Sequence, residues 1–409
     1  MSGLDVLDAA AARALAAGDP LTALKYVALR GDPLALALRG IAMAQFGDFA
    51  RAKALLRRAA RAFGSHEPVA RARCLVAEAE VALVSRDLGG PLQRLHDARK
   101  ILTAHGDHAN ALHAGYLEAR RLLLIGRIDE SERTLDTLHV ERLPPASQAG
   151  CWLVAAGIAM RRIRAAPAYA ALARARRTAR AVGIPSLMAE VERAARALQA
   201  PAALLVTRAG SHPLDLDEVE ALFASDSLLV DACRSSVRAG AHVIRLTSRP
   251  VLFELARALA EAWPEDVPRT TLLARVFRAR HIDESHRARL RVDIGRLRKL
   301  LAPLLGIAAT ARGFALHPHH ATTVAVLAPP VEEGYARVMS LFADNATWSS
   351  SALALALDVS PRTVQRTLEA LATAGKVEPV GRGRARRWMV TNVPGFPTAL
   401  LLPTPAAHG

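Results

Sequence analysis

Cysteine, lysine and aromatic residues are scarce in this chain of 409 residues. The three cysteines, Cys74, Cys151 and Cys233, are odd in number and far apart, which gives neither a disulfide framework nor a zinc-binding pattern and favours a reducing compartment. No apolar run approaches the roughly 20 residues that span a bilayer, and the first residues lack the basic start of a signal peptide. We therefore expect a cytoplasmic protein without membrane contact.

Motifs that carry enzyme chemistry are also missing. The sequence has no nucleophile elbow, no phosphate-binding glycine loop and no metal-ligand spacing, and its four Tyr and four Trp provide little for an aromatic substrate pocket. We expect neither catalysis nor a bound cofactor or metal. The length and the 51% of hydrophobic residues predict a globular chain of several domains.

Positive charge is abundant, with a formal net charge of +16 and 49 arginines against five lysines. The net charge is +10 in residues 1–200 and +6 in residues 201–409, so neither half stands out as a polyanion-binding part. Local clusters of arginine are therefore better evidence of a nucleic-acid surface than the total charge.

Residues 1–200 read as one helix after another, rich in Ala, Leu and Arg, with turns at Gly-Asp and Pro pairs. The segment from Gly40 to Ala59 has small residues where two antiparallel helices would approach closely. It resembles a tetratricopeptide repeat, and weaker copies follow at intervals of about 37 to 40 residues. The resemblance implies an array whose concave surface serves a protein partner or self-association. The alternative is a helical spacer whose apolar stripes are only core.

An arginine cluster without acids occupies residues 161–180. Its members are Arg161, Arg162, Arg164, Arg174, Arg176, Arg177 and Arg180. Such a run is usually a solvated helix face, and additional phosphate contact is the second reading.

Residues 283–316 combine an apolar helix face with a basic one. Leucine and isoleucine recur at helical spacing, at Leu290, Ile294, Leu297, Leu300 and Leu301. Between His286 and Leu300, the other positions carry one acid, Asp293, and six cations: Arg287, Arg289, Arg291, Arg296, Arg298 and Lys299. This pattern suits a helix that lies against phosphates and base edges. The residues after it predict a short hairpin that turns at Arg312.

Residues 228–317 as a whole resemble the DNA-binding domain of OmpR/PhoB-type winged-helix regulators. Strand-like segments at 228–231, 236–238 and 242–249 and helices at 250–263 and 269–277 extend the likeness beyond the basic helix. The resemblance implies duplex DNA as the ligand, with the basic helix reading bases and phosphates and Arg312 in the wing. Gly295, inside the helix, departs from the pattern and costs about 1 kcal/mol relative to Ala. No receiver domain precedes this segment, so we do not expect control by aspartyl phosphorylation.

Residues 331–393 give a second DNA-binding pattern. Helices are predicted at 332–342 and 350–357, followed by a tight turn and a helix that starts at Pro361 with Ser360 as its N-cap. A helix-turn-helix inserts such first turns into the major groove. Arg362, Gln365 and Arg366 suit base edges, whereas Thr363 and Ser360 suit phosphates. The residues after this helix predict two strands with a basic tip, as in a winged helix of the bacterial-repressor kind, and the tip would reach DNA through Arg382, Arg384, Arg386 and Arg387.

The remaining segments are expected to connect these parts. Residues 201–227 and 318–330 are expected to be linkers because Pro and Gly interrupt the pattern, with a short helix in the first and a β-like piece at 322–327 in the second. His317, His319 and His320 are more consistent with a polar linker than with a metal site, because acidic and cysteine partners are missing nearby. Residues 394–409 form a Pro-rich tail.

Together these patterns predict a mainly α chain, in which a tetratricopeptide-like array (1–200) precedes two winged-helix domains (228–317 and 331–393) with small β-sheets. We expect a bacterial-type transcriptional regulator that binds specific double-stranded DNA, with the array used for dimerisation or partner sensing. The alternative is an interaction scaffold whose winged helices bind protein. A shallow salt dependence of DNA binding would favour the scaffold.

Overall fold

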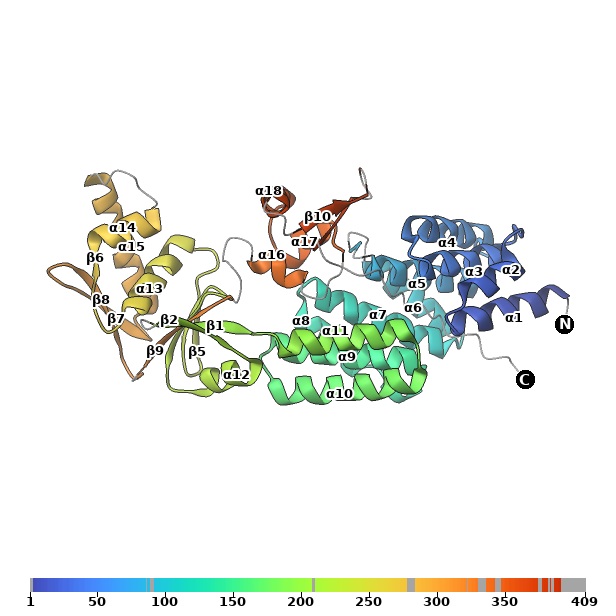
Figure 1. Ribbon diagram of the computed structural model, residues 1–409, viewed down its shortest axis with the longest axis horizontal. Helices are drawn as coiled ribbons and strands as arrows, with labels where there is room; N and C mark the ends of the chain where they lie inside the picture. Colours follow the sequence, from blue (N-terminus) through green and yellow to red (C-terminus); the bar gives the residue numbers. More distant parts are fainter. Residues whose placement is uncertain are drawn as a thin grey trace. The chain divides into compact units, whose positions relative to one another are not determined.

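The structure is a computed structural model that describes residues 3–85, 87–88, 92–207, 210–277, 284–321, 323–329, 336–342, 347–373, 377–381, 383 and 386–390. The chain is mainly helical with small sheets, as predicted (Figure 1). It divides into a helical unit (Met1–Arg162, Ala166–Ala197 and Val338–Gly409) and a sheet unit (Ile163–Ala165 and Leu198–Arg337). Of the helices that the structure describes, none combines the length and apolarity needed to cross a bilayer.

The helical unit begins with an array of consecutive helices, which we call the helical array. Its elements are α1 (Gly3–Ala16), α2 (Pro20–Val27), α3 (Pro33–Gln45), α4 (Phe49–Phe63), α5 (Pro68–Val84), α6 (Leu92–Ala104), α7 (His108–Leu124), α8 (Ile128–Asp136), the 3-10 helix η1 (Val140–Arg142), α9 (Pro145–Arg161), α10 (Ala165–Val182) and α11 (Pro185–Gln199). Each helix from α1 to α7 packs against the next in the chain. The Gly-Asp turns explain several of the helix starts, because Asp32 and Asp48 accept hydrogen bonds from the backbone N–H groups of Ala35 and Arg51 at 3.0 and 3.1 Å.

Small residues bring α3 and α4 close together. A Cβ added to Gly40 would lie 2.9 Å from Leu56 Cγ and 3.2 Å from the carbonyl oxygen of Ala52, so only glycine fits without a shift. Ala52, Leu56 and Ala59 are all buried. The close approach expected in this segment is therefore present, whereas its assignment as a tetratricopeptide repeat stays a prediction.

A buried polar chain connects three helices of the array. His113 on α7 lies 2.9 Å from Ser147 Oγ on α9 through Nδ1 and 3.1 Å from Glu80 Oε2 on α5 through Nε2. All three residues are buried. His113 thus has a partner for each ring nitrogen in place of water, and the three side chains link the alternate helices α5, α7 and α9.

The sheet unit contains a six-stranded sheet in the order β2-β1-β9-β3-β4-β5 and a three-stranded sheet in the order β6-β8-β7. Its strands are β1 (Ala203–Thr207), β2 (Gly210–Leu214), β3 (Leu228–Asp231), β4 (Ser236–Ala239), β5 (His242–Arg245), β6 (Val267–Pro268), β7 (Leu305–Ala309), β8 (Gly313–Pro318) and β9 (Val324–Ala328). Its helices are α12 (Leu216–Ala224), α13 (Pro250–Ala262), α14 (Arg269–Phe277) and α15 (Glu284–Leu301). Strands and helices thus occur where the sequence predicted them between residues 228 and 317.

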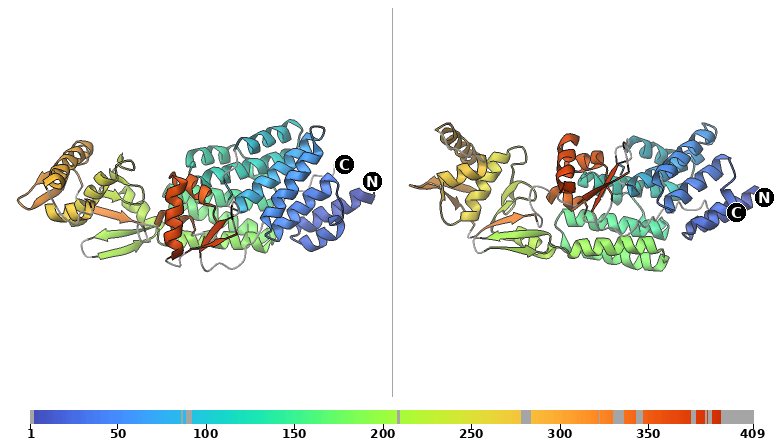
Figure 2. Two further views of the ribbon diagram at one scale, coloured as in Figure 1. Left: turned by 90° about the horizontal axis from the view of Figure 1, so that it is seen from above. Right: turned by 45° about the horizontal axis from the view of Figure 1, so that its top comes forward.

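The two segments expected to be linkers are part of this sheet, which corrects that expectation. Residues 201–227 form β1, β2 and α12, and residues 318–330 contain β9, so the short helix and the β-like piece expected within these segments are present. Strand β9 pairs in parallel with β3 and antiparallel with β1, and Figure 2 shows it as the orange strand among the green ones. Pro213 suggests an interruption because proline is rare inside a strand, but β2 is an edge strand, where a missing N–H is tolerated.

Helices cover both faces of the six-stranded sheet. Val326 of β9 belongs to the core that includes α13, whereas its neighbour Leu327 packs with Val219 of α12, as the alternation of side chains along a strand requires. The first core continues into α15 and the three-stranded sheet through Leu290, Ile294 and Phe314. One hydrophobic core therefore fixes α15 against the rest of the unit.

The last part of the helical unit is a small group of helices and strands, which we call the C-terminal subdomain. It consists of α16 (Ala336–Leu341), α17 (Ser350–Leu357), α18 (Pro361–Thr373), β10 (Val377–Val380) and β11 (Arg387–Val390), with β10 and β11 paired antiparallel. Trp348 and Trp388 are buried and exchange backbone hydrogen bonds of 2.8 and 2.7 Å. The helices at 350–357 and from Pro361, and the hairpin after them, match the sequence prediction.

Candidate nucleic-acid interface

Helix α15 has a sharply divided surface. Leu290, Ile294, Leu297 and Leu301 are buried at the spacing i, i+4, i+7 and i+11, which is the repeat of a helix with one face in a core. Leu300, which the sequence assigned to the same face, is only half-buried. All six cations predicted to face a ligand are exposed. The core thus holds the helix in a fixed rotation with its cationic face outward.

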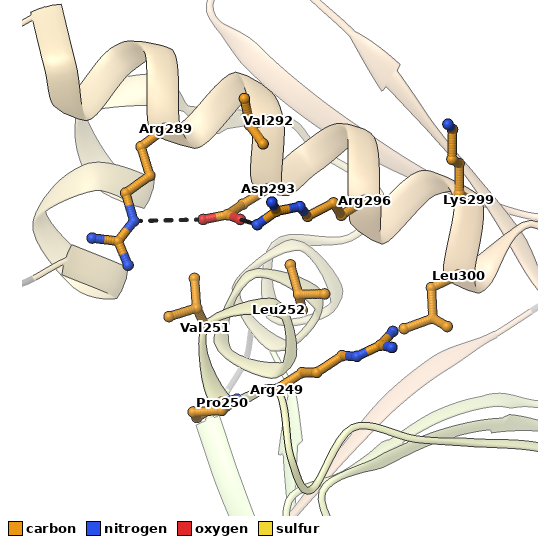
Figure 3. A pocket seen from close by; sticks show the side chains of 10 residues that line it. All are labelled: Arg249, Pro250, Val251, Leu252, Arg289, Val292, Asp293, Arg296, Lys299 and Leu300. Atoms are coloured by element: carbon orange, nitrogen blue, oxygen red, sulfur yellow. Dashed lines mark hydrogen bonds and ion pairs between the residues drawn. The ribbon is translucent and has the colours of Figure 1, made fainter.

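Asp293 organises two of these cations. The Asp293 carboxylate is buried, and it lies 3.2 Å from Arg296 Nη1 and 3.8 Å from Arg289 Nε. Figure 3 shows the carboxylate between the two guanidinium groups. Both arginine side chains stay largely exposed, at 69% and 61%. The buried acid therefore orients two exposed guanidinium groups without withdrawing them from solvent.

A second pair of cations shares an exposed acid at the start of the helix. Glu284 accepts hydrogen bonds from Arg291 Nη2 at 2.7 Å and from Arg287 Nη1 at 3.4 Å. The Glu284 side chain is 71% exposed, so these pairs add little to stability. An incoming phosphate can replace Glu284 as the partner of both arginines.

The end of the helix meets the β7–β8 hairpin. Arg298 Nε donates a hydrogen bond of 2.7 Å to the carbonyl oxygen of Ile307, which directs its side chain to the hairpin. Lys299 is exposed on the neighbouring side of the helix. Arg298 thus links helix and hairpin, a role that the sequence did not suggest.

The hairpin carries Arg312 at its turn. Gly313 is required there, because a Cβ would lie 1.7 Å from the carbonyl oxygen of Val267. Thr310 Oγ1 donates to Asp266 Oδ2 at 2.5 Å and accepts from the N–H of Gly313 at 2.8 Å. Arg312 is 73% exposed with a distant partner, Asp266, at 3.9 Å. A rigid turn therefore projects one cation beside α15.

A groove of about 920 Å³ lies between α15 and the start of α13. Its rim has the cations Arg249, Arg289, Arg296 and Lys299, and its apolar lining includes Val251 and Val292 (Figure 3). The groove thus combines cationic side chains, which can neutralise a polyanion, with aliphatic ones beside the basic face of α15.

Helix α18 presents a second set of exposed polar residues. Ser360 caps it by accepting a hydrogen bond of 3.2 Å from the N–H of Thr363. Val364, Leu368 and Leu371 are buried, as predicted. Arg362 and Arg366 are exposed, and neither has an ion-pair partner among the residues that the structure describes.

The other two predicted polar residues of α18 make local contacts. Gln365 Nε2 donates to Glu369 Oε1 at 2.9 Å, one turn further along the helix. The hydroxyl groups of Thr363 and Ser360 lie 2.9 Å apart. The predicted residues of this helix are therefore together on its N-terminal half, with the arginines most accessible.

The basic hairpin of the C-terminal subdomain requires a correction. Arg387, predicted to reach DNA, donates from Nε to the carbonyl oxygen of Ser85 at 3.2 Å, and its Nη2 lies 3.3 Å from Asp87 of the helical array. Its side chain is only 15% exposed. Arg386 is exposed and stacks on Trp388 at 4.4 Å from the ring centroid. Arg382 and Arg384 lie outside the described residues.

Asp87 is a shared partner of two cations. Burial raises the pKa of its carboxyl, but Lys53 Nζ at 2.7 Å and the guanidinium of Arg387 more than offset this effect, so the pKa lies below its ordinary value of 3.8. The carboxylate is therefore charged at neutral pH and holds Arg387 on the array.

Some of these roles leave a trace in the sequence. Asp293 stands four residues after Arg289 and three before Arg296, the spacing at which helical side chains pair, so its pairing is predictable in retrospect. Arg249 and Arg387 carry no such signal, because their neighbours come from other parts of the chain. Comparison of the chain with protein-family models, with curated proteins and with solved structures finds no significant match.

Proposed function

We propose that this protein is a transcriptional regulator that binds specific double-stranded DNA through α15 with the β7–β8 hairpin and through α18. The observation that supports this most is the exposed cationic face of α15, anchored by a buried leucine stripe and flanked by the exposed Arg312. Cations at this density neutralise phosphates, and arginine also reads guanine edges in the major groove.

The order of elements in the sheet unit supports a winged helix of the OmpR/PhoB type. Strands β3 to β5 precede three helices, and the β7–β8 hairpin follows the last of them. In the C-terminal subdomain, α17, α18 and the β10–β11 hairpin have the order of a second winged helix. In this proposal the helical array, built of tetratricopeptide-like repeats, serves dimerisation or senses a partner, and the protein works on the nucleoid in the cytoplasm.

One observation favours a second role for the C-terminal subdomain. Its hairpin residue Arg387 contacts Ser85 and Asp87 of the array rather than pointing to solvent. A subdomain that already uses its hairpin for a protein contact fits a scaffold module. In that case α15 alone reads DNA.

The experiment starts with a duplex selected from a random library by the wild-type protein. Its affinity is compared with that of an unrelated duplex across a salt series, for the wild type and for Arg287→Ala/Arg291→Ala. These two arginines pair in the structure with the exposed Glu284, so their loss leaves the core intact. We expect the double variant to bind at least about tenfold more weakly, with a shallower salt dependence.

Arg61→Ala/Arg71→Ala is the matched control, because both arginines are exposed on the array and the variant loses the same charge. If the control variant lost as much affinity as the α15 variant, the loss of affinity would reflect the lower net charge and not a contact made by α15. Equal affinity of the wild type for every duplex would contradict the proposed function.

A further inference from the structure

The outermost residues of α15 form a stripe of their own. Ala288, Val292, Gly295 and Lys299 each stand two positions before one of the buried residues Leu290, Ile294, Leu297 and Leu301. Two residues correspond to about 200° around a helix, so this stripe lies opposite the core. Three of its four members are apolar or small, in a helix whose other exposed positions are mostly charged.

Val292 is the most unusual member of the stripe. It is 53% exposed and lines the groove between α15 and α13. Charged pairs flank it, with Arg289 and Arg296 held by Asp293 and with Arg287 and Arg291 held by Glu284. The surface thus has an apolar centre between cations, whereas a helix face exposed only to water usually has polar residues at its centre.

Among the residues that the structure describes, none requires a glycine at position 295. A Cβ added there would meet nothing within 4 Å, and its backbone does not need a positive φ. Glycine inside a helix is less favourable than alanine. A surface that approaches the helix closely from outside would give glycine an advantage at this position.

We propose that Val292 contacts the C5 methyl group of a thymine in the major groove and that Gly295 lets the α15 backbone approach the base edges. The inference rests on the proposed function. Thymine presents the apolar group of the major groove, and valine is the apolar side chain at the centre of this face. The flanking arginines then reach phosphates on either side. Val292 is a residue that determines specificity, and Gly295 sets the depth of insertion.

The test replaces thymine by uracil, one position at a time, in the duplex selected by the wild type. Uracil pairs in the same way and lacks only the methyl group. We expect one or two positions at which the wild type loses about fourfold in affinity, the value of one buried methyl group. Val292→Ala binds the original duplex more weakly by a similar factor and is insensitive to uracil at those positions. The second variant, Val292→Thr, keeps nearly the same side-chain volume but replaces one methyl group by a hydroxyl, so it tests the apolar contact separately from the volume.

Gly295→Ala separates a contact with DNA from a structural role. The substitution raises the thermal midpoint, because alanine favours the helix and meets no obstacle, and it lowers the affinity for the selected duplex. Lower stability together with lower affinity would assign Gly295 to folding, and unchanged affinity would overturn the close approach.

The outcomes distinguish the inference from the function on which it depends. If the wild type shows no preference for any duplex, both the proposed function and the thymine contact are wrong. A wild type that prefers its selected duplex but loses nothing on any uracil substitution, or a Val292→Ala variant that responds to uracil as the wild type does, overturns the thymine contact alone. In that case the apolar centre of α15 serves a protein partner.

Discussion

Arg387 shows how a residue's environment decides its role. Its sequence neighbourhood, a run of arginines in a hairpin, is typical of a DNA-contacting tip, but its guanidinium lies against Ser85 and Asp87 of the array. Arg386, one position earlier, remains exposed over Trp388. Ser85 lies 302 residues before Arg387 in the sequence. No local sequence pattern can therefore predict this contact.

We expect Arg387 and Asp87 to be energetically coupled. In a double-mutant cycle with Arg387→Ala and Asp87→Asn, thermal or denaturant unfolding should give a coupling on the order of 0.5–1 kcal/mol, as for other partly exposed pairs. Arg362→Ala is the matched control, because Arg362 is an exposed arginine of the same subdomain without an ion-pair partner among the described residues, and it should leave stability nearly unchanged. Additive effects of the two substitutions would show that the pair does not hold the subdomain on the array.

The coupling should also depend on pH in one direction. Because the folded-state pKa of Asp87 lies below 3.8, the contact is at full strength above that pH and weakens as the pH falls through the lower folded-state value. The same cycle measured at pH 7 and near pH 3 therefore shows a smaller coupling at the lower pH. A coupling that grows on acidification would contradict the ion pair.

Local sequence patterns predict the helices and strands whose formation depends on neighbouring residues. The helices at Pro250, Arg269 and Pro361 and the capped helix after Ser360 follow from periodicity and end signals. The pairing of strand β9 does not, although the sequence predicts a β-like piece there, because β9 pairs with β1 and β3, which come about a hundred residues earlier in the chain. Strand β1 pairs with β9 and with the edge strand β2. Pro, Gly and a locally acidic run in residues 201–227 indicate a break in the pattern, but such signals do not reveal an edge strand.

The packing of α3 against α4 gives a prediction at this scale. Gly40→Ala should destabilise the helical unit by about 1–3 kcal/mol, because the new methyl group would lie 2.9 Å from Leu56 Cγ in a packed interface. Gly31→Ala is the control, since a Cβ there meets nothing within 4 Å. Denaturant unfolding compares the two. Equal midpoints would mean that the helices separate without cost.

The whole molecule carries two basic helices in two different units of one chain, α15 in the sheet unit and α18 in the helical unit. In our proposal both read DNA. Linking two readers in one chain raises the effective concentration of the second once the first has bound, and it lengthens the recognised site. Exposed arginines on both helices support this account, and the Arg387 contact with the array supports the rival in which α18 belongs to a protein-binding module.

The most direct test of two readers is hydroxyl-radical footprinting on the selected duplex. We predict two protected segments with the wild-type protein. Arg287→Ala/Arg291→Ala should lose protection in one segment, and Arg362→Ala/Arg366→Ala, which removes two exposed cations of α18, should lose it in the other. A single protected segment that depends only on the α15 variant would contradict the account and make the C-terminal subdomain a protein-contact module.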